Sequence, residues 1–331
     1  MTYYPIIIPT LNRYSHFRAC IESLARCTYA SETELIIGLD FPPNNKYIEG
    51  WKKIKDFIPK IQGFKKVICF ERRENFGSAK NSSALQNYAL TKYDAYIYTE
   101  DDNIFSPNFL DFINKGLEKY KDNPNVVAVC GYSYPIYWES SYKSILQHQY
   151  FSAWGYGEWG YKLKKMKYEF TPKYLAEYLK NKNNRRKIKE LSNKNYRYAS
   201  SFLYLDSIPI YDISRSVYLC ISKKNVLMPT ESLVRNTGFD GSGEHCSFET
   251  GYVFVNQKIS GEKEFDVANT SEVVSQALER FNQKLGNDFK LLRFSAQLKY
   301  FLLDMFGYKA AVCIFTKLNQ VKRFFKKIIF M

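Results

Sequence analysis

The sequence predicts an α/β protein whose mostly parallel sheet is flanked by helices, followed by an aromatic-rich region and a C-terminal helical extension. Two observations predict this class. Over roughly the first 130 residues, short apolar segments alternate with longer amphipathic ones, which is the pattern of βαβ units. Polar motifs follow the apolar segments, as expected where strands end at a ligand-binding edge. With 331 residues, 45% of them hydrophobic, the chain can bury a substantial core.

Strands and helices can be assigned in order along this first part. Each predicted strand is a short apolar or aromatic run, and each predicted helix is a longer segment between two such runs. The strands are expected at residues 4–8, 34–39, 66–70, 95–99 and 126–131. The helices are expected at residues 15–27, 47–57, 78–90 and 107–120. The last helix should have Ser106 as its N-cap and Pro107 at the first helical position, where a missing N–H costs little.

Polar motifs follow four of the predicted strands. They are PTLNR at residues 9–13, Asp40, ENFGSAKN at residues 74–81 and EDDN at residues 100–103. Because ligands bind beyond the carboxyl ends of strands in such sheets, these motifs are expected to meet at one edge. The sequence therefore predicts a ligand site there.

Three consecutive carboxylates, Glu100, Asp101 and Asp102, carry the chemical argument. A run of charge is often only a solvated surface. At the edge of an α/β sheet, however, carboxylate oxygens can hold Mg²⁺ or Mn²⁺ while substrate phosphates complete the coordination shell. The motif at residues 74–81 could receive such a phosphate at a helix N-terminus. Its candidate contacts are Asn75, Gly77, Ser78 and Lys80.

The rest of the chain is aromatic and basic. Aromatic residues cluster at residues 132–170, where glycines at 155, 157 and 160 favour a loop that comes close to a ligand, although an aromatic cluster is also typical of a core. If residues 313–331 form a helix, one face is apolar and much of the other is basic. Such a helix suits an anionic membrane surface, or else packs on its own domain.

Composition excludes several classes of protein. No stretch reaches the length of a membrane span, and the first residues do not resemble a signal peptide, so we expect a cytoplasmic protein. Seven cysteines without a CxxC pair and three histidines argue against a disulfide framework or a histidine-rich metal centre. The formal charge of +15 suits phosphates, membranes or nucleic acid, but no nucleic-acid-binding motif is present.

With these motifs in place, the sequence resembles GT-A-fold inverting glycosyltransferases over roughly residues 3–250. The segment around the EDD triplet is similar to the metal-binding region of the N-acetylglucosaminyltransferase I family. The segments SAWGYGEWGYKLKKM and VLMPTESLVRNTGFDGSGEHC resemble bacterial transferases of surface-polysaccharide assembly. The resemblance implies a nucleotide-sugar-binding half at residues 1–131, an acceptor-binding and catalytic half at residues 132–260, and a helical region at residues 261–331.

The resemblance also implies roles for single residues. Asp102 would be the principal metal ligand, with Glu100 and Asp101 supporting the ribose and the metal shell, and Asp40 would accept from the uracil N–H. His245 would contact the metal or the diphosphate. The residues expected around the nucleoside are Pro9, Thr10, Asn12, Arg13 and Asp40.

An inverting transferase also needs a base that takes the proton from the acceptor hydroxyl. The resemblance places it at Asp212, although the families usually have Trp where this chain has Tyr211. Glu158, Asp240 and Glu244 are competing candidates.

We therefore expect a glycosyltransferase that depends on Mn²⁺ or Mg²⁺ and moves a sugar from a nucleotide donor, a UDP-sugar, to a glycan or lipid-linked acceptor at the inner face of the cell membrane. Nucleic acid is not an expected partner. A sugar-1-phosphate nucleotidyltransferase is an alternative, but it should carry a glycine-rich, arginine-containing loop where this chain has PTLNRYSHFR. A catalytically silent scaffold is a further alternative.

Overall fold

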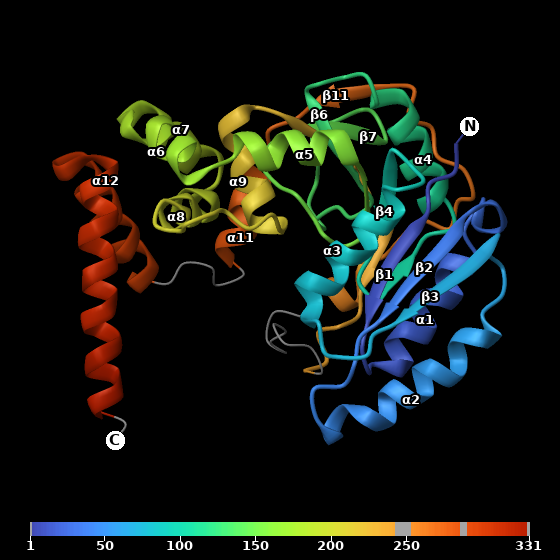
Figure 1. Cartoon of the computed structure of the whole chain (residues 1–331). Helices are drawn as coiled ribbons and strands as arrows, with labels where there is room; N and C mark the ends of the chain where they lie inside the picture. The colour runs from blue at the N-terminus through green and yellow to red at the C-terminus, as the bar shows by residue number, and fades with distance from the viewer. Residues whose placement is uncertain (1, 242–252, 285–289, 330–331) are drawn as a thin grey trace. The chain divides into compact units, whose positions relative to one another are not determined.

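The structure is a computed structural model that describes residues 2–241, 253–284 and 290–329 (Figure 1). The chain forms two compact units. The first, here called the sheet unit, comprises Met1–Gln147, Ser152–Leu163 and Asn225–Val273. The second, here called the helical unit, comprises His148–Phe151, Lys164–Lys224 and Val274–Met331.

A nine-stranded mixed sheet forms the core of the sheet unit, in the order β11-β7-β9-β6-β8-β4-β1-β2-β3. The strands β3, β2, β1 and β4 are parallel, and β8 is antiparallel between β4 and β6. The strands of this sheet are β1 (Ile6–Thr10), β2 (Glu34–Leu39), β3 (Lys66–Glu71), β4 (Ala95–Tyr98), β6 (Val126–Cys130), β7 (Ser144–Gln147), β8 (Tyr156–Trp159), β9 (Asn225–Pro229) and β11 (Thr270–Glu272). A separate antiparallel pair joins β5 (Asn103–Phe105) to β10 (Val234–Asn236).

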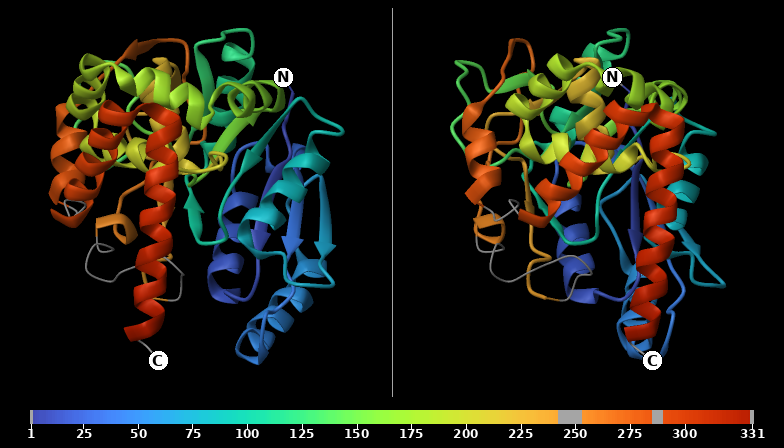
Figure 2. Two further views of the ribbon diagram at one scale, coloured as in Figure 1. Left: turned by 60° about the vertical axis from the view of Figure 1, so that its left-hand side comes forward. Right: turned by 90° about the vertical axis from the view of Figure 1, so that its left-hand side faces the viewer.

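Helices cover both faces of this sheet, as parallel strands with two apolar faces require (Figures 1 and 2). The central strands are accordingly buried, and Ile6, Ile7 and Ile8 of β1 have no exposed surface. The helices of the sheet unit are α1 (Tyr14–Ala25), α2 (Ile48–Phe57), α3 (Gly77–Ala89), α4 (Phe109–Tyr120) and the start of α5 (Gly160–Glu169), with 3-10 turns η1 (Ala30–Glu32), η2 (Asn45–Tyr47) and η3 (Ile58–Lys60).

Helices make up the described part of the helical unit. Several begin with a side-chain cap, as at Thr171, Asn181 and Ser192, whose oxygens each accept from a backbone N–H one turn on. The helices that lie wholly in this unit are α6 (Pro172–Lys180), α7 (Lys182–Leu191), α8 (Asn193–Phe202), α9 (Asp212–Ser222), α11 (Gln276–Lys284) and α12 (Lys290–Ile329). Gly307, with a φ of 68°, interrupts α12 and divides it into two segments.

The predicted α/β class and its mostly parallel sheet are confirmed, with one wrong helix start. The last predicted helix begins at Phe109 rather than Pro107, and its N-cap is Asn108 rather than Ser106. The single proton of the Ser106 hydroxyl lies between two acceptors, Asn108 Oδ1 and the Ser260 carbonyl oxygen, and the Phe109 N–H donates to the Ser106 carbonyl rather than to its side chain. Among the described helices, none is long and apolar enough to cross a membrane.

Candidate active site

The candidate site lies where the strand order reverses. From β1 the chain continues to β2 and β3 on one side, whereas β4 lies on the other side of β1. In open α/β sheets this reversal leaves a crevice at the carboxyl ends of the two central strands, and ligands bind there. Thr10 ends β1, and Glu100, Asp101 and Asp102 follow β4.

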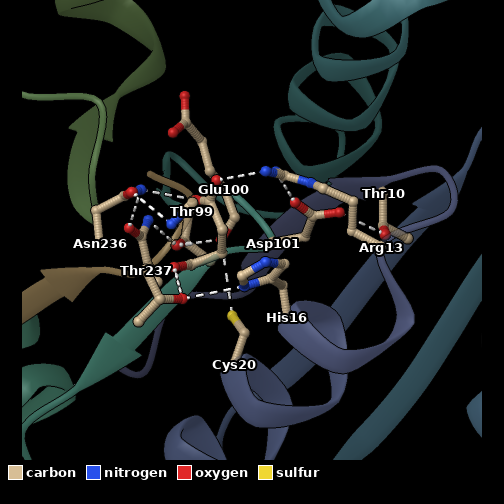
Figure 3. Close-up of polar contacts among 12 residues, drawn as sticks. Thr10, Arg13, His16, Cys20, Thr99, Glu100, Asp101, Asn236 and Thr237 are labelled. Atoms are coloured by element: carbon tan, nitrogen blue, oxygen red, sulfur yellow. Dashed lines mark hydrogen bonds and ion pairs between the residues drawn. The ribbon is translucent and has the colours of Figure 1, made fainter. Parts of the chain in front are cut away.

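The acidic residues are held by side chains from the end of β1 (Figure 3). Thr10 Oγ1 donates to Asp101 Oδ2 over 2.7 Å. Arg13 lies between the two aspartates, with Nη2 at 2.5 Å from Asp101 Oδ1 and Nη1 at 2.8 Å from Asp102 Oδ2. Only 6% of Asp101 and 5% of Asp102 are exposed, so these two aspartates are not solvated surface charges, whereas Glu100 is partly exposed.

A second set of contacts comes from residues that follow β10. Asn236 Nδ2 donates to Asp102 Oδ1 over 2.7 Å, and both the backbone N–H and the hydroxyl of Thr237 donate to the Asp102 carbonyl over 2.8 Å. Gly238 then passes so close that a Cβ there would lie 2.1 Å from Asp102 Oδ2. Asp102 is therefore fixed on both its carboxylate and its backbone.

These contacts set the charge of the site. Burial raises the pKa of Asp101, an effect that Arg13 opposes. Burial alone would lower the pKa of Arg13, but Asp101 and Asp102 outweigh it and the pKa of Arg13 is raised. Two buried carboxylates thus share one guanidinium, which leaves the pair with an uncompensated negative charge when both are ionised.

The donor set fits a divalent cation that takes most of its ligands from a substrate. Within the described residues, no group of three or more His, Cys, Asp or Glu side chains could hold a metal ion. Mg²⁺ is commonly bound by one or two carboxylates and substrate phosphates rather than by a full protein cage. Asp101 and Asp102 supply hard oxygen ligands of that kind.

His16 also contacts the segment after β10, which the sequence analysis did not anticipate. Its Nε2 lies 2.8 Å from Asp240 Oδ2, and its Nδ1 lies 3.2 Å from Thr237 Oγ1. The contacts of residue 16 with residue 237 and of residue 102 with residue 236 join distant parts of the chain, so no spacing in the sequence predicts them. Only the presence of NTGFD in a recognised motif marked this segment as a candidate.

Asp40 is engaged by the start of α3. Its Oδ1 accepts from the N–H groups of Phe41 and Phe76 over 2.9 and 2.8 Å, and its Oδ2 accepts from the Gly77 N–H over 2.9 Å. The carboxylate therefore occupies the backbone donors to which a phosphate at this helix start would bind.

The other predicted residues of this motif lie around the same turn. Asn75 Nδ2 donates to the Phe41 carbonyl over 2.7 Å. Lys80 Nζ lies 3.2 Å from Glu74 Oε1 and 3.7 Å from the centre of the Phe76 ring. Ser78 is exposed on the first turn of α3, and Gly77 has a φ of +70° that favours glycine.

Three of the residues that the sequence predicts for the site make contacts through their backbone atoms. Pro9 pairs with Gly38 within the sheet, and the Asn12 carbonyl accepts from the Tyr14 N–H. The Glu100 carbonyl accepts from Thr99 Oγ1 over 2.9 Å.

The candidate bases differ in accessibility. Glu158 lies on β8 with none of its surface exposed, and its Oε2 accepts from the Tyr96 hydroxyl over 2.8 Å. A carboxylate buried in the middle of a sheet cannot meet an acceptor, so we do not retain Glu158 as a base. Asp212 is exposed at the first position of α9, in the helical unit. Glu244 and His245 lie outside the described residues.

The chain matches the family model "Glycosyl transferase family 2" over residues 6–175, and no curated protein matches. Three solved structures are similar at 14% identity: a mannosyltransferase from Pyrobaculum calidifontis in complex with GDP-Man and Mn²⁺, a 1–349 fragment of S. aureus TarS, and mouse xyloside xylosyltransferase 1. Their TM-scores are 0.35, 0.35 and 0.26, and they cover 50%, 64% and 40% of this chain.

The match covers 46%, 58% and 55% of those three solved chains, about half the length of each. The family model, by contrast, spans just over half of this chain. The matched residues include β1, β4 and the acidic residues Glu100, Asp101 and Asp102. The chain therefore belongs to glycosyl transferase family 2, and it has a GT-A fold.

Proposed function

We propose that this chain is a glycosyltransferase that moves a sugar from a UDP-sugar to a glycan or lipid-linked acceptor in surface polysaccharide or lipopolysaccharide synthesis, with inversion at the anomeric carbon. The observation that carries the donor assignment is the buried Asp101–Asp102 pair at the reversal point of the sheet. Polar side chains from the ends of β1 and β10 fix both carboxylates. Burying the two carboxylates costs desolvation free energy. A ligand that brings a cation, such as a metal-bound diphosphate, accounts for their presence at this place.

Asp102 is the residue that would hold Mn²⁺ or Mg²⁺, with Asp101 beside it. When bound, the cation neutralises the diphosphate of the donor. Arg13 is a second positive group at the same place; a guanidinium is ionised throughout the physiological range, and Asp101 and Asp102 raise its pKa further. Thr10 orients Asp101, and Asn236 orients Asp102.

The roles proposed for the other site residues rest on the resemblance to GT-A-fold inverting glycosyltransferases. Asp40 would contact the uracil while also ordering the start of α3, and Pro9, Asn12 and Glu100 would line the nucleoside. Asp212 would accept the proton of the acceptor hydroxyl, a role that its exposure at the start of α9 supports. Association of the C-terminal helix with an anionic membrane surface, at the inner face of the cell membrane, also belongs to this proposal.

Calorimetric titration of a panel of UDP-sugars, with and without Mn²⁺, tests the donor assignment. We expect one donor to bind in the presence of the metal, and Asp102→Ala to weaken that binding at least about a hundredfold, a change of ~3 kcal/mol. Asp122→Ala is the matched control, because Asp122 is an exposed aspartate of the same unit. If no UDP-sugar binds the wild-type protein with the metal present, or if Asp102→Ala binds as well as Asp122→Ala, the proposal is wrong.

A further inference from the structure

The net positive charge of the chain lies in one of its two units. The helical unit contains 26 of the 48 Lys and Arg residues but only 8 of the 33 Asp and Glu residues, a net charge of +18. The sheet unit, with the remaining 22 and 25, has a net charge of −3. The charge of +15 is thus not a general property of the surface. It marks one unit as the partner of something anionic.

The same unit exposes large apolar side chains on α12. Phe301 is 56% exposed and Met305 is 61% exposed, and because they are four residues apart they lie on one face of the helix. Phe306 at 51% and Leu318 at 48% follow along the same helix. Exposed apolar residues that gather on one element mark an interaction surface more strongly than scattered ones.

Other side chains of α12 make contacts within the helical unit. Arg185 of α7 forms two contacts with the Asp304 carboxylate, at 2.7 and 3.0 Å, so the acidic residue beside the apolar side chains is neutralised. The Tyr300 hydroxyl donates to the Tyr196 carbonyl over 2.7 Å. The Phe315 ring lies 4.4 Å from that of Tyr204. The Tyr300 contact thus anchors the segment of α12 before Gly307, and the Phe315 contact anchors the segment after it, while Phe301 and Met305 stay exposed.

We propose that the helical unit binds an anionic lipid bilayer through Phe301 and Met305 of α12, an inference that rests on the membrane association included in the proposed function and gives it a definite contact surface. Phe301 and Met305 would enter the interface between headgroups and acyl chains, and the surrounding Lys and Arg residues would face anionic headgroups. Figures 1 and 2 show that the last part of α12 extends past α6, α7 and α8 of the same unit. Lys309 and Lys317 are exposed on that segment.

This proposal differs from the expectation drawn from the sequence. The amphipathic pattern placed the membrane contact on the terminal helix alone, with apolar residues between positions 314 and 328. In the structure Ile314 and Phe315 are only partly exposed, and Phe315 packs on Tyr204. Among the α12 side chains that the structure describes, the most exposed large apolar ones are Phe301, Met305 and Phe306, which precede Gly307, and the net charge of +18 belongs to the unit as a whole.

An anionic bilayer explains both the net positive charge of the helical unit and the exposed apolar side chains of α12 better than other binding partners do. A nucleic-acid duplex would account for the charge, but it is bound through phosphate contacts and does not need exposed Phe and Met side chains on the same helix. A second copy of the chain would account for the apolar residues, but two surfaces of the same strong positive charge repel each other. An anionic bilayer attracts the charge and accepts the apolar side chains.

Vesicle co-sedimentation of the full chain tests the proposal, and it needs no donor, metal or acceptor, so its outcome is independent of the proposed transfer. We expect binding to vesicles of phosphatidylglycerol and phosphatidylcholine, little binding to phosphatidylcholine alone, and a decrease as salt is raised. The double variant Phe301→Asp, Met305→Asp should bind at least about tenfold more weakly. Lys309→Glu, Lys317→Glu should weaken binding about fivefold per lysine.

Matched controls lie in the sheet unit. Tyr137→Asp changes an aromatic residue that is 79% exposed, and Lys52→Glu, Lys65→Glu makes the same change in net charge at exposed positions. Both should bind vesicles as the wild type does. The proposal is overturned if the controls lose as much binding as the α12 variants or if neutral vesicles bind equally well. It is also overturned if a short DNA duplex competes fully while Phe301→Asp, Met305→Asp has no effect, or if that variant only dissociates a dimer.

Discussion

Gly238 approaches the Asp102 carboxylate so closely that no side chain fits between them. Its position is set by Asn236, whose Oδ1 accepts from the Gly238 N–H over 2.9 Å while its Nδ2 donates to Asp102. A single Asn side chain thus fixes both the carboxylate and the backbone beside it. The glycine is needed for close approach, since its φ is not in the left-handed region.

We predict that Gly238→Ala weakens binding of the nucleotide donor at least tenfold, about 1.4 kcal/mol, while the protein stays folded. The added Cβ would lie 2.1 Å from Asp102 Oδ2, so either the carboxylate or the segment after β10 must move. Calorimetric titration with the donor and Mn²⁺ measures the loss, and thermal unfolding reports the fold. Gly261→Ala is the control, because no atom lies within 4 Å of the Cβ it would add. Equal donor affinity in the two variants would show that the position of Asp102 does not matter for binding.

Among elements, α3 depends on a carboxylate from another part of the chain. Asp40 follows β2, yet its oxygens accept from the Phe76 and Gly77 N–H groups at the start of α3. A negative charge at this end also interacts favourably with the helix dipole. The contact ties α3 to the carboxyl end of β2, next to the edge where the candidate site lies.

We predict that Asp40→Asn destabilises the protein by about 1–2 kcal/mol. An amide keeps one acceptor oxygen and replaces the other with a donor, which cannot pair with the N–H groups that Asp40 now serves. Urea unfolding measures the change in the free energy of unfolding. The control is Glu74→Gln, which makes the same chemical change at an exposed position before the same helix. If both variants unfold at the same urea concentration, the capping role assigned to Asp40 is wrong.

The sequence predicted the elements whose signal is local. The expected strands at residues 34–39 and 126–131 match β2 and β6 to within one residue, because strands buried on both faces are continuous apolar runs. It did not predict β5, β10 or the antiparallel insertion of β8, since these depend on pairing with distant strands. For the same reason Asp102 could be chosen from the sequence, whereas Asn236, 134 residues away, could not. Pairing over such separations leaves no periodic pattern.

At the scale of the whole molecule, the two units carry different chemistry. Every residue that contacts Asp101 or Asp102 in the described structure, among them Thr10, Arg13 and Asn236, belongs to the sheet unit. The helical unit contains Asp212 and has the net positive charge of +18. Donor binding and the handling of an acceptor should therefore be separable by substitution.

We predict that Asp212→Asn leaves donor affinity within about twofold of the wild type but lowers the rate of transfer by a factor of 10²–10⁴, the usual contribution of a general base. The amide keeps the shape of the side chain and loses its basicity, and the Asp212 carbonyl can still accept from Ser216 Oγ, so α9 should remain intact. Asp206→Asn, at another exposed aspartate of the helical unit, is the control and should transfer normally. Calorimetry with the donor and a transfer assay with a lipid-linked acceptor separate the two steps. Transfer at the wild-type rate by Asp212→Asn would remove Asp212 as the base and leave Asp240 and Glu244 as the candidates to test next.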